Sequence, residues 1–332
     1  MVLAEKALIA QVRHMAKRAR NSLVRTSIGD DCAVLQLSPN RGTKNDAIVT
    51  TDFSLEGIHF RRDWHSPESI GHRCLTRGLS DIAAMGGVPV AAFLSLALPR
   101  DVSHSWVNRF TRALLALAAK YRVTLAGGDT AESPAGILAD IVVVGIAPEG
   151  RAVLRSGASP GNIVYVSGEL GGSAAAVKEM EKGMEKKFKR KLNPRYYPRH
   201  FFPEPRIEVG RFLREKKLVT AMIDTSDGLS TDLAHICEES RVGAELQVEA
   251  IPRARVGHPA QTVDLDLALH GGEDYELLFT AAANQRIPSR IAGVSITPIG
   301  RTTRARKITL INQDGIRSEL KPQGWEHFRK RD

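Results

Sequence analysis

Residues 219–239 read VTAMIDTSDGLSTDLAHICEE, and the fold class can be inferred from this stretch. Residues 219–223 are mostly apolar and predict a short strand, whereas residues 229–239 indicate a helix. Between them lies an acidic turn that contains Asp224, Asp227 and a glycine. Asp and Gly both suit turns. The order of strand, polar turn and helix is typical of α/β proteins.

The same alternation extends along the chain in both directions. Ser66 and Ser103 are favoured cap residues, and each predicts the start of a helix. The further predicted strands are 46–52, 90–98, 123–126, 137–147, 162–166, 275–281, 296–299 and 307–311, and the further helices are 66–86, one that starts at 103, and 172–180. The turn-rich GASPG at residues 157–161 predicts a boundary between two domains, residues 1–155 and 156–332.

Composition narrows the classes of protein. The 332 residues are 42% hydrophobic and 25% charged, which excludes a disordered chain, a collagen-like repeat and a coiled coil. No run approaches ~20 apolar residues, so no membrane-spanning helix is expected. The amphipathic N-terminal stretch predicts a helix packed on its own domain. Three scattered cysteines fit neither a disulfide framework nor a zinc site and favour a reducing cytoplasm.

The net charge of +10 is concentrated in one stretch. Residues 178–200 hold nine Lys or Arg and three Glu, which gives 9 − 3 = +6. A solvated helix end followed by an extended connector is the simpler interpretation. The alternative is a nucleic-acid-binding patch in which Phe188, Tyr196 and Tyr197 lie between basic side chains. That alternative leaves the acidic motifs of the chain without a role, so no nucleic-acid partner is expected.

Acidic residues recur beside Gly, Ser or Thr, mostly after apolar strands. The sites are Asp30-Asp31, Thr50-Thr51-Asp52, Asp81, Asp129, Asp224 to Asp227, and Glu273-Asp274. Because strand ends of an α/β layer converge at one edge, these carboxylates can gather in space. Gathered carboxylates repel one another unless cations lie between them, and hard oxygen ligands suit Mg²⁺. The neighbouring glycines let backbone N–H groups approach phosphate oxygens. The residues therefore predict a site for several Mg²⁺ ions and a nucleotide.

Seven motifs, in order along nearly the whole chain, resemble the thiamine-monophosphate kinase family. They are IGDDCAVL (28–35), TTDFSLEGIHF (50–60), LSDIAAMG (79–86), GGDT (127–130), IDTSDGL (223–229), GGEDYELLF (271–279) and GWEHF (324–328). The first motifs are shared with a wider ATP-binding superfamily, whereas GGEDYELLF and GWEHF are more specific. The resemblance implies an α/β (α+β) fold with two aminoimidazole ribonucleotide synthetase-like domains. It also implies a homodimer in which the N-terminal domains of the two copies share a β-barrel-like core.

The resemblance also implies an activity. The family phosphorylates thiamine monophosphate with ATP, in the presence of Mg²⁺, to give thiamine diphosphate, and it acts as a homodimer in the cytoplasm, with no membrane partner. The acceptor is a phosphate monoester whose second pKa is ~6, so no general base is expected, and transfer would be direct and in line. Another ATP-dependent enzyme of the superfamily is the alternative. The cysteine positions do not match those of selenophosphate synthetase or the hydrogenase maturation factor.

Roles for individual residues come from the same resemblance. The metal ligands would be Asp31, Thr50, Thr51, Asp52, Asp81, Asp129, Asp224 and Asp227, with Thr50 acting through its backbone. ATP would contact Gly128, Asp129, Arg155 and Ser226, and thiamine monophosphate would contact His59, Glu273 and Trp325. From the residues alone, Trp325 could instead fill a core, His59 could be a loop histidine, and Arg155 a surface turn residue. One departure is Gly78, where the family usually has Asn ahead of Leu-Ser-Asp.

Overall fold

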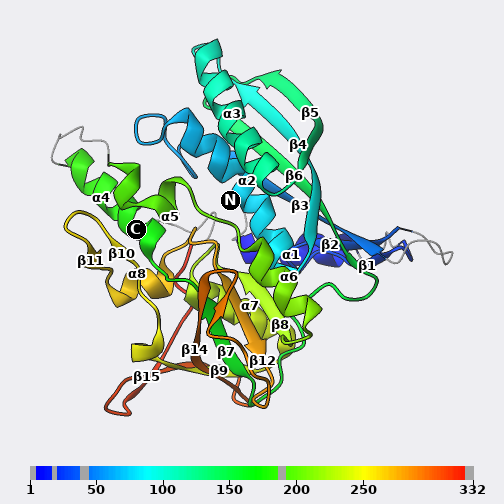
Figure 1. Ribbon diagram of the computed structural model, residues 1–332, viewed down its shortest axis with the longest axis vertical. Coiled ribbons are helices and arrows are strands. Elements are labelled where there is room, and N and C mark those ends of the chain that lie inside the picture. Colours follow the sequence, from blue (N-terminus) through cyan, green and yellow to red (C-terminus); the bar gives the residue numbers. More distant parts are fainter. Residues whose placement is uncertain (1–4, 17–20, 38–44, 186–191, 326–332) are drawn as a thin grey trace.

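The computed structural model describes residues 5–16, 21–37, 45–185 and 192–325 of the chain. It contains two large β-sheets, one formed within residues 24–148 and the other within residues 163–319. Helices lie between the sheets and around them (Figure 1). None of the helices in these ranges is both long and apolar enough to span a membrane.

The first sheet has six strands. Their order is β1 (Val24–Thr26), β2 (Ala33–Gln36), β3 (Asn45–Leu55), β6 (Leu138–Pro148), β4 (Val88–Leu98) and β5 (Thr124–Glu132). Neighbouring strands are antiparallel except β4 and β5, which are parallel. Helices α2 (Pro67–Ala84) and α3 (His104–Lys120) pack on one face of this sheet (Figure 1).

Helix α2 is the central element of the molecule. Its start follows from the predicted cap, because Ser66 Oγ accepts a hydrogen bond from Ser69 N–H at 3.2 Å. Leu75, Leu79 and Ile82 are fully buried. The helix packs against α3, β3 and β6, and also against α6 (Ile207–Glu215) and β8 (Ala221–Asp224) of the second half. Residues of α2 therefore lie between the two sheets.

The second sheet is also mixed, with mostly antiparallel pairs. Its order is β16 (Arg317–Glu319), β15 (Ile308–Ile311), β9 (Gly243–Gln247), β14 (Val294–Thr303), β7 (Ile163–Ser167), β12 (Leu277–Ala281) and β8, with β13 (Arg290–Ile291) paired to β14. On one face, apolar residues of α7 (Leu229–Ser240) pack against the sheet. On the other face, Met222, Leu277 and Phe279 join the apolar core around α2.

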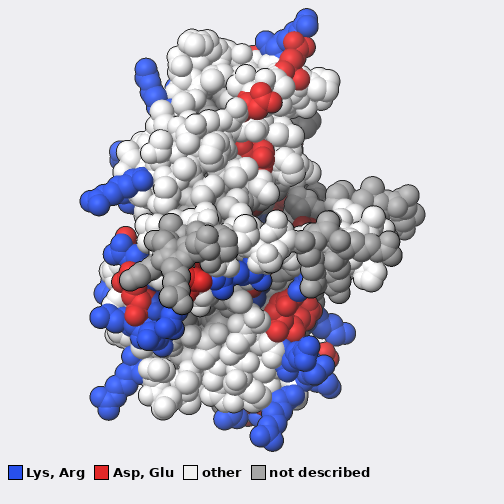
Figure 2. Space-filling model, turned by 90° about the vertical axis from the view of Figure 1, so that its right-hand side faces the viewer, with Lys and Arg blue, Asp and Glu red and all other residues white. Residues whose placement is uncertain are grey.

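Among the described residues, no helix covers the other face of the first sheet. Strand register places Phe53, Asp140, Ser95 and Asp129 in one row across β3, β6, β4 and β5. Phe53 and Phe93 are 55% and 39% exposed. Figure 2 shows this side of the molecule, where the upper part, over the sheet, is mostly uncharged and Lys and Arg gather lower down. In the described part of one chain the sheet is open and does not close into a barrel.

Several shorter elements complete the fold, and some differ from the sequence prediction. They are α1 (Glu5–Ala16), α4 (Gly172–Glu185), η1 (Pro194–Tyr196), α5 (Pro198–Phe201), η2 (Val248–Ala250), β10 (Arg255–Val256), β11 (Gln261–Thr262) and α8 (Leu265–His270). Helix α1 buries none of its residues, although its Arg13 lies against Gly29 of the N-terminal domain. Arg13 also forms an ion pair with Glu239 of α7 at 2.9 Å.

The basic stretch 178–200 is described only in part, because residues 186–191 lie outside the described ranges. Residues 194–201 form two short helices, and His200 and Phe201 are buried. The second half of this stretch is therefore not the extended, solvated connector that its prolines predict. Helix α6, which follows it, has no counterpart among the predicted helices.

Candidate active site

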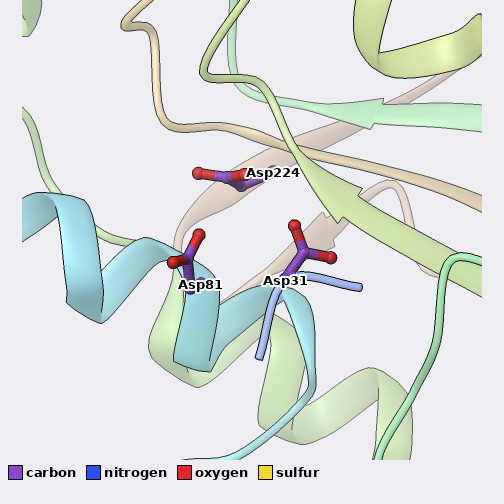
Figure 3. A group of neighbouring side chains, drawn as sticks. All are labelled: Asp31, Asp81 and Asp224. Atoms are coloured by element: carbon purple, nitrogen blue, oxygen red, sulfur yellow. The ribbon is translucent and has the colours of Figure 1, made fainter. Parts of the chain in front are cut away.

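Three carboxylates from distant parts of the chain meet between the two sheets. Asp31 precedes β2, Asp81 lies in the last turn of α2, and Asp224 ends β8. One carboxylate oxygen of each lies within 4.8 Å of the other two. Figure 3 shows the three side chains converging on a common space. The structure therefore brings together three of the residues that the motifs single out.

Neighbouring polar groups hold and extend this cluster. Thr50 Oγ1 donates a hydrogen bond to Asp81 Oδ2, and Ser80 Oγ donates one to Asp224 Oδ2 at 2.5 Å. Asp52, two residues after Thr50 in β3, lies near Asp81, and its charge contributes to raising the pKa of Asp81. Thr50 thus acts here through its side chain, which the prediction of a backbone role did not include.

Burial and mutual repulsion raise the pKa values in the cluster. Burial, and then the charge of Asp31, raises the pKa of Asp224 to about 8. Burial and the charges of Asp52 and Asp224 raise the pKa of Asp81 well above its usual range. The buried Oδ2 atoms of Asp31 and Asp52 have no hydrogen-bond donor among the described residues. Carboxylate oxygens in this state are suited to ligate a hard divalent cation, which would relieve the repulsion.

Arg155 lies against the cluster. Its Nη2 donates to Asp31 Oδ1 at 2.7 Å, and its backbone N–H donates to Asp30 Oδ2 at 3.2 Å. It is therefore not a solvated turn residue. The guanidinium presents forked donors beside the carboxylates, which is the geometry that suits phosphate oxygens.

Thr51, Gly128 and Asp129 are not brought to this cluster within one chain. The motif TTD does not lie at a strand end as predicted, since β3 continues to Leu55. Side chains alternate along a strand, so Thr51 faces the open side, where its Oγ1 donates to Asp140 Oδ1 at 2.7 Å. Gly128 and Asp129 lie within the exposed edge strand β5, and register puts Asp129 on that same open side.

The turn after β8 is joined to the segment around Glu273. Glu273 N–H donates to Ser226 O at 2.8 Å, and Tyr275 N–H donates to Thr225 O at 3.0 Å. Burial, and then the charge of Glu5, raises the pKa of Asp227 to about 6. These contacts place Ser226 and Asp227, expected to bind nucleotide and metal, next to a residue expected to bind the acceptor.

The C-terminal part of the described chain returns to the same turn. Trp325 N–H donates to Asp227 O at 3.1 Å. Position 324 requires glycine, because a Cβ there would lie 2.0 Å from Asp227 O. Trp325 is 40% exposed and therefore does not fill a core. Residues 326–328 of the motif GWEHF lie outside the described residues.

Glu273 is held by two arginines of α2. Its Oε2 accepts from Arg73 Nη2 at 2.6 Å, and its Oε1 accepts from Arg77 Nη1 at 3.1 Å. Burial works to raise the pKa of Glu273, but the charges of Arg73 and Arg77 outweigh it and lower the pKa to about 2. His59 Nδ1 accepts a hydrogen bond from Leu55 N–H at 3.0 Å. His59, Arg73 and Arg77 line a cavity of about 10 Å³.

The sequence motifs do not include Arg73 and Arg77, although a signal for both exists. Residues 73, 77 and 81 recur every four positions, which places them on one face of a helix. Asp81 of the motif LSDIAAMG therefore marks the face on which both arginines lie.

Both halves of the chain match domains of known proteins. Residues 29–147 match the AIR synthase related protein, N-terminal domain, and residues 159–311 match the C-terminal domain of the same name. Thiamine-monophosphate kinase of Salmonella typhimurium is 36% identical over 99% of this chain and 99% of its own length. The Bacillus subtilis enzyme of that name is 33% identical over 93% of this chain and 95% of its own length. The chain belongs to the thiamine-monophosphate kinase family.

Solved structures of the family share the fold. "AaThiL complexed with AMPPCP and TMP" matches with a TM-score of 0.81 and 30% identity, over 99% of both chains. Thiamine-monophosphate kinase from Stenotrophomonas maltophilia K279a matches with a TM-score of 0.72 and 32% identity, over 94% of this chain and 98% of that one. The hydrogenase maturation protein HypE in complex with ATP, at 16% identity and a TM-score of 0.68, shares the fold alone. The predicted two-domain fold is thereby confirmed.

Proposed function

We propose that this chain transfers the γ-phosphate of ATP to thiamine monophosphate, giving ADP and thiamine diphosphate. The observation that carries the proposal is the convergence of Asp31, Asp81 and Asp224 beside a turn bonded to both Glu273 and Trp325. A carboxylate cluster of this kind can accept two anionic phosphate substrates only when divalent cations lie between the charges. The relative with 30% identity over the whole chain is described with an ATP analogue and TMP.

Each part of the site has a separate task in this reaction. Asp31, Asp52, Asp81 and Asp224 would hold Mg²⁺ ions, which screen the repulsion between the two phosphates when bound. Arg155 donates to phosphate oxygens of the nucleotide. Trp325 offers an exposed aromatic face to a heteroaromatic ring of the acceptor. No side chain has to remove a proton, because the acceptor phosphate is already largely ionised, and transfer is direct.

The open face of the first sheet supports a homodimer. Phe53 and Phe93 are exposed there, and edge strand β5 is unpaired on its outer side in the described chain. We propose that the sheets of two copies pair through this face, and that Asp129 of one copy completes the site of the other. Within each copy, we place the boundary between the two domains near residue 155. Phe93→Glu should convert the dimer into an inactive monomer, measured by light scattering. A Phe93→Glu protein that remains dimeric would argue against this interface.

The decisive experiment is an ADP-release assay with a panel of acceptors, with the products identified by phosphorus NMR. Thiamine monophosphate should give a diphosphate product, whereas thiamine should give none. ADP release with a different acceptor, and none with thiamine monophosphate, would point to another enzyme of the superfamily. Recovery of a kinetically competent phosphorylated protein would contradict direct transfer.

We place the reaction in the cytoplasm, since all three cysteines are free and buried.

A further inference from the structure

Arg77 lies at the junction of the two halves of the site. It extends from α2 between Asp52 of the carboxylate group and Glu273 of the acceptor side. Its Nη1 donates to Glu273 Oε1 at 3.1 Å and to Tyr275 Oη at 3.3 Å. These two bonds fix one edge of the guanidinium plane and leave its Nε edge directed elsewhere.

The Nε edge is buried and has no acceptor. Arg77 Nε lies 4.0 Å from Asp52 Oδ1, longer than the ~2.8 Å of a charge-assisted hydrogen bond. Among the described residues, the buried Arg77 Nε finds no acceptor and the buried Asp52 Oδ2 finds no donor. A buried donor left without a partner is costly, so such a pair is expected where a ligand supplies the missing oxygen.

Arg77 and Arg73 differ in how fully their donors are used. Both donate to Glu273, and Arg77 also lies 4.0 Å from Asp52. Arg73 in addition donates to the carbonyl oxygens of His200 and His59. Arg77 is the one of the two that keeps a buried donor without an acceptor among the described residues. Guanidinium groups bind phosphate oxygens well, because their donors are planar and weakly hydrated.

The adjacent position cannot do this work. A Cβ at Gly78 would lie 2.5 Å from Val143 Cγ2, so residue 78 packs against β6 with no room for a polar side chain. Of the two neighbouring residues 77 and 78, Arg77 is therefore the one that can offer a polar side chain to the site.

We propose that Arg77 binds the phosphate group of thiamine monophosphate, its Nε–H donating to a phosphate oxygen beside Asp52. This inference rests on the proposed function. It assigns the phosphate to the acceptor and not to ATP because Arg77 is anchored by Glu273 and Tyr275, and Glu273 lies on the acceptor side of the proposed site. Arg155 occupies the equivalent place beside Asp31 on the nucleotide side. Arg77 would neutralise the acceptor phosphate while it approaches the γ-phosphate.

The test is isothermal titration calorimetry with the full-length wild-type protein and the Arg77→Met variant in the presence of Mg²⁺. The three ligands, measured separately, are thiamine monophosphate, thiamine and AMPPCP. For Arg77→Met, the Kd of thiamine monophosphate should rise about tenfold or more, which is the value of one hydrogen bond to a charged group. The Kd values of thiamine and of AMPPCP should change by less than about twofold, since neither uses this contact. Arg211→Met, which removes an exposed arginine of α6, is the matched control and should change none of them.

Three results would overturn the inference. An equal loss for thiamine and thiamine monophosphate would mean that Arg77 only positions Glu273. A selective loss for AMPPCP would move the contact to ATP, and unchanged affinity for all three would remove the contact. If Arg77→Met does not fold, Arg77→Lys replaces it in the same titrations. For Arg77→Lys, the Kd of thiamine monophosphate alone should rise, by a smaller factor than the one expected for Arg77→Met. The proposed function fails separately, when wild-type protein forms no diphosphate.

Discussion

The two faces of the first sheet differ in what covers them and in the contacts of their polar side chains. On the covered face, Thr50 and Asp52 are directed at α2 and meet Asp81. On the open face, Thr51 lies in a row with exposed or half-buried residues of the neighbouring strands, and its hydroxyl donates to Asp140. Consecutive residues of one motif thus serve different surfaces. The difference teaches that three consecutive motif residues in a strand cannot all be assigned to one site, because successive side chains of a strand point to opposite faces.

The largest expected effect tests whether both faces are needed. Asp52→Ala on the covered face and Asp129→Ala on the open face should each reduce turnover by about a thousandfold or more, as expected for the loss of a ligand at a phosphoryl-transfer centre. Both variants should keep the far-ultraviolet circular dichroism of the wild type. Near-normal turnover in either one would refute the metal assignment of that residue.

The second prediction tests whether the residues on the two faces belong to one chain's site or to sites shared between two chains, and it uses a mixture of these two inactive variants. If Asp129 acts on the site of the partner, a mixed dimer contains one site with both aspartates intact. Random reassortment should then restore about a quarter of wild-type turnover, because half of the dimers are mixed and each has one complete site. Continued inactivity, with exchange of subunits verified by native mass spectrometry, would mean that both residues act in the same chain.

A smaller effect is expected from a matched pair of serines. Ser80→Ala removes the hydroxyl that donates to Asp224 on the covered side, and turnover should fall about tenfold because a charged acceptor loses its donor. Ser95→Ala, in the row of Asp129 on the open face, should change turnover by less than about twofold. Steady-state kinetics at saturating substrates gives both values, and similar losses would erase the distinction between the faces.

The smallest expected effect is a change in how the stability of the protein depends on pH, and it arises from two buried histidines beside α2. His65 Nε2 and His200 Nε2 lie 2.9 Å apart in the core beside α2. Burial, and then the charge of Arg73, lowers the pKa of His65 to about 4 and that of His200 well below its usual range. The unfolded chain therefore binds more protons than the folded one below pH ~6.5, and stability falls as the pH drops from 6.5 toward 4.

At pH 5 the contribution of His65 to this loss is about 2 kcal/mol. His65→Gln should remove that share of the pH dependence, measured as the difference in free energy of unfolding from wild type at pH 5 and pH 7.5. The difference cancels the titration of the acidic cluster, which acts in the opposite direction. His104→Gln, at the exposed start of α3, should leave the pH dependence unchanged. A wild-type slope in His65→Gln would contradict the neutral, buried state of this ring.

Much of the fold could be read from the sequence, because caps and apolar strands are local signals. The Ser66 and Ser103 caps lie where predicted, and α2 and α3 follow them. Strands β3 and β5 were predicted too short, since polar residues in both appear to end an apolar run but in fact line an open face. Helix α6 has few local signals and is stabilised by packing against α2.

The site could be predicted in kind but not in all its members. Motifs identify Asp31, Asp81 and Asp224, and the structure brings them together. Which face Thr51 lies on depends on the alternation of side chains along β3 and on the register of β3 with β6, which involves residues about 90 positions away. Arg73 and Arg77 could not be recognised from motifs, because their role depends on Glu273, about 200 residues away in the sequence, reaching the same face of α2.

The tight approach of Gly324 to the Asp227 carbonyl has a consequence for a shortened chain. The amide groups of residues 323–325 bond to the turn at 227–231, and Trp325 is expected to contact the acceptor. Residues 323–325 follow the last strand of the second sheet, β16, by only a few positions. Both sheets and the carboxylate cluster are therefore formed by residues that precede position 323, and a chain cut there would lose the Trp325 contact while keeping the residues that form both sheets.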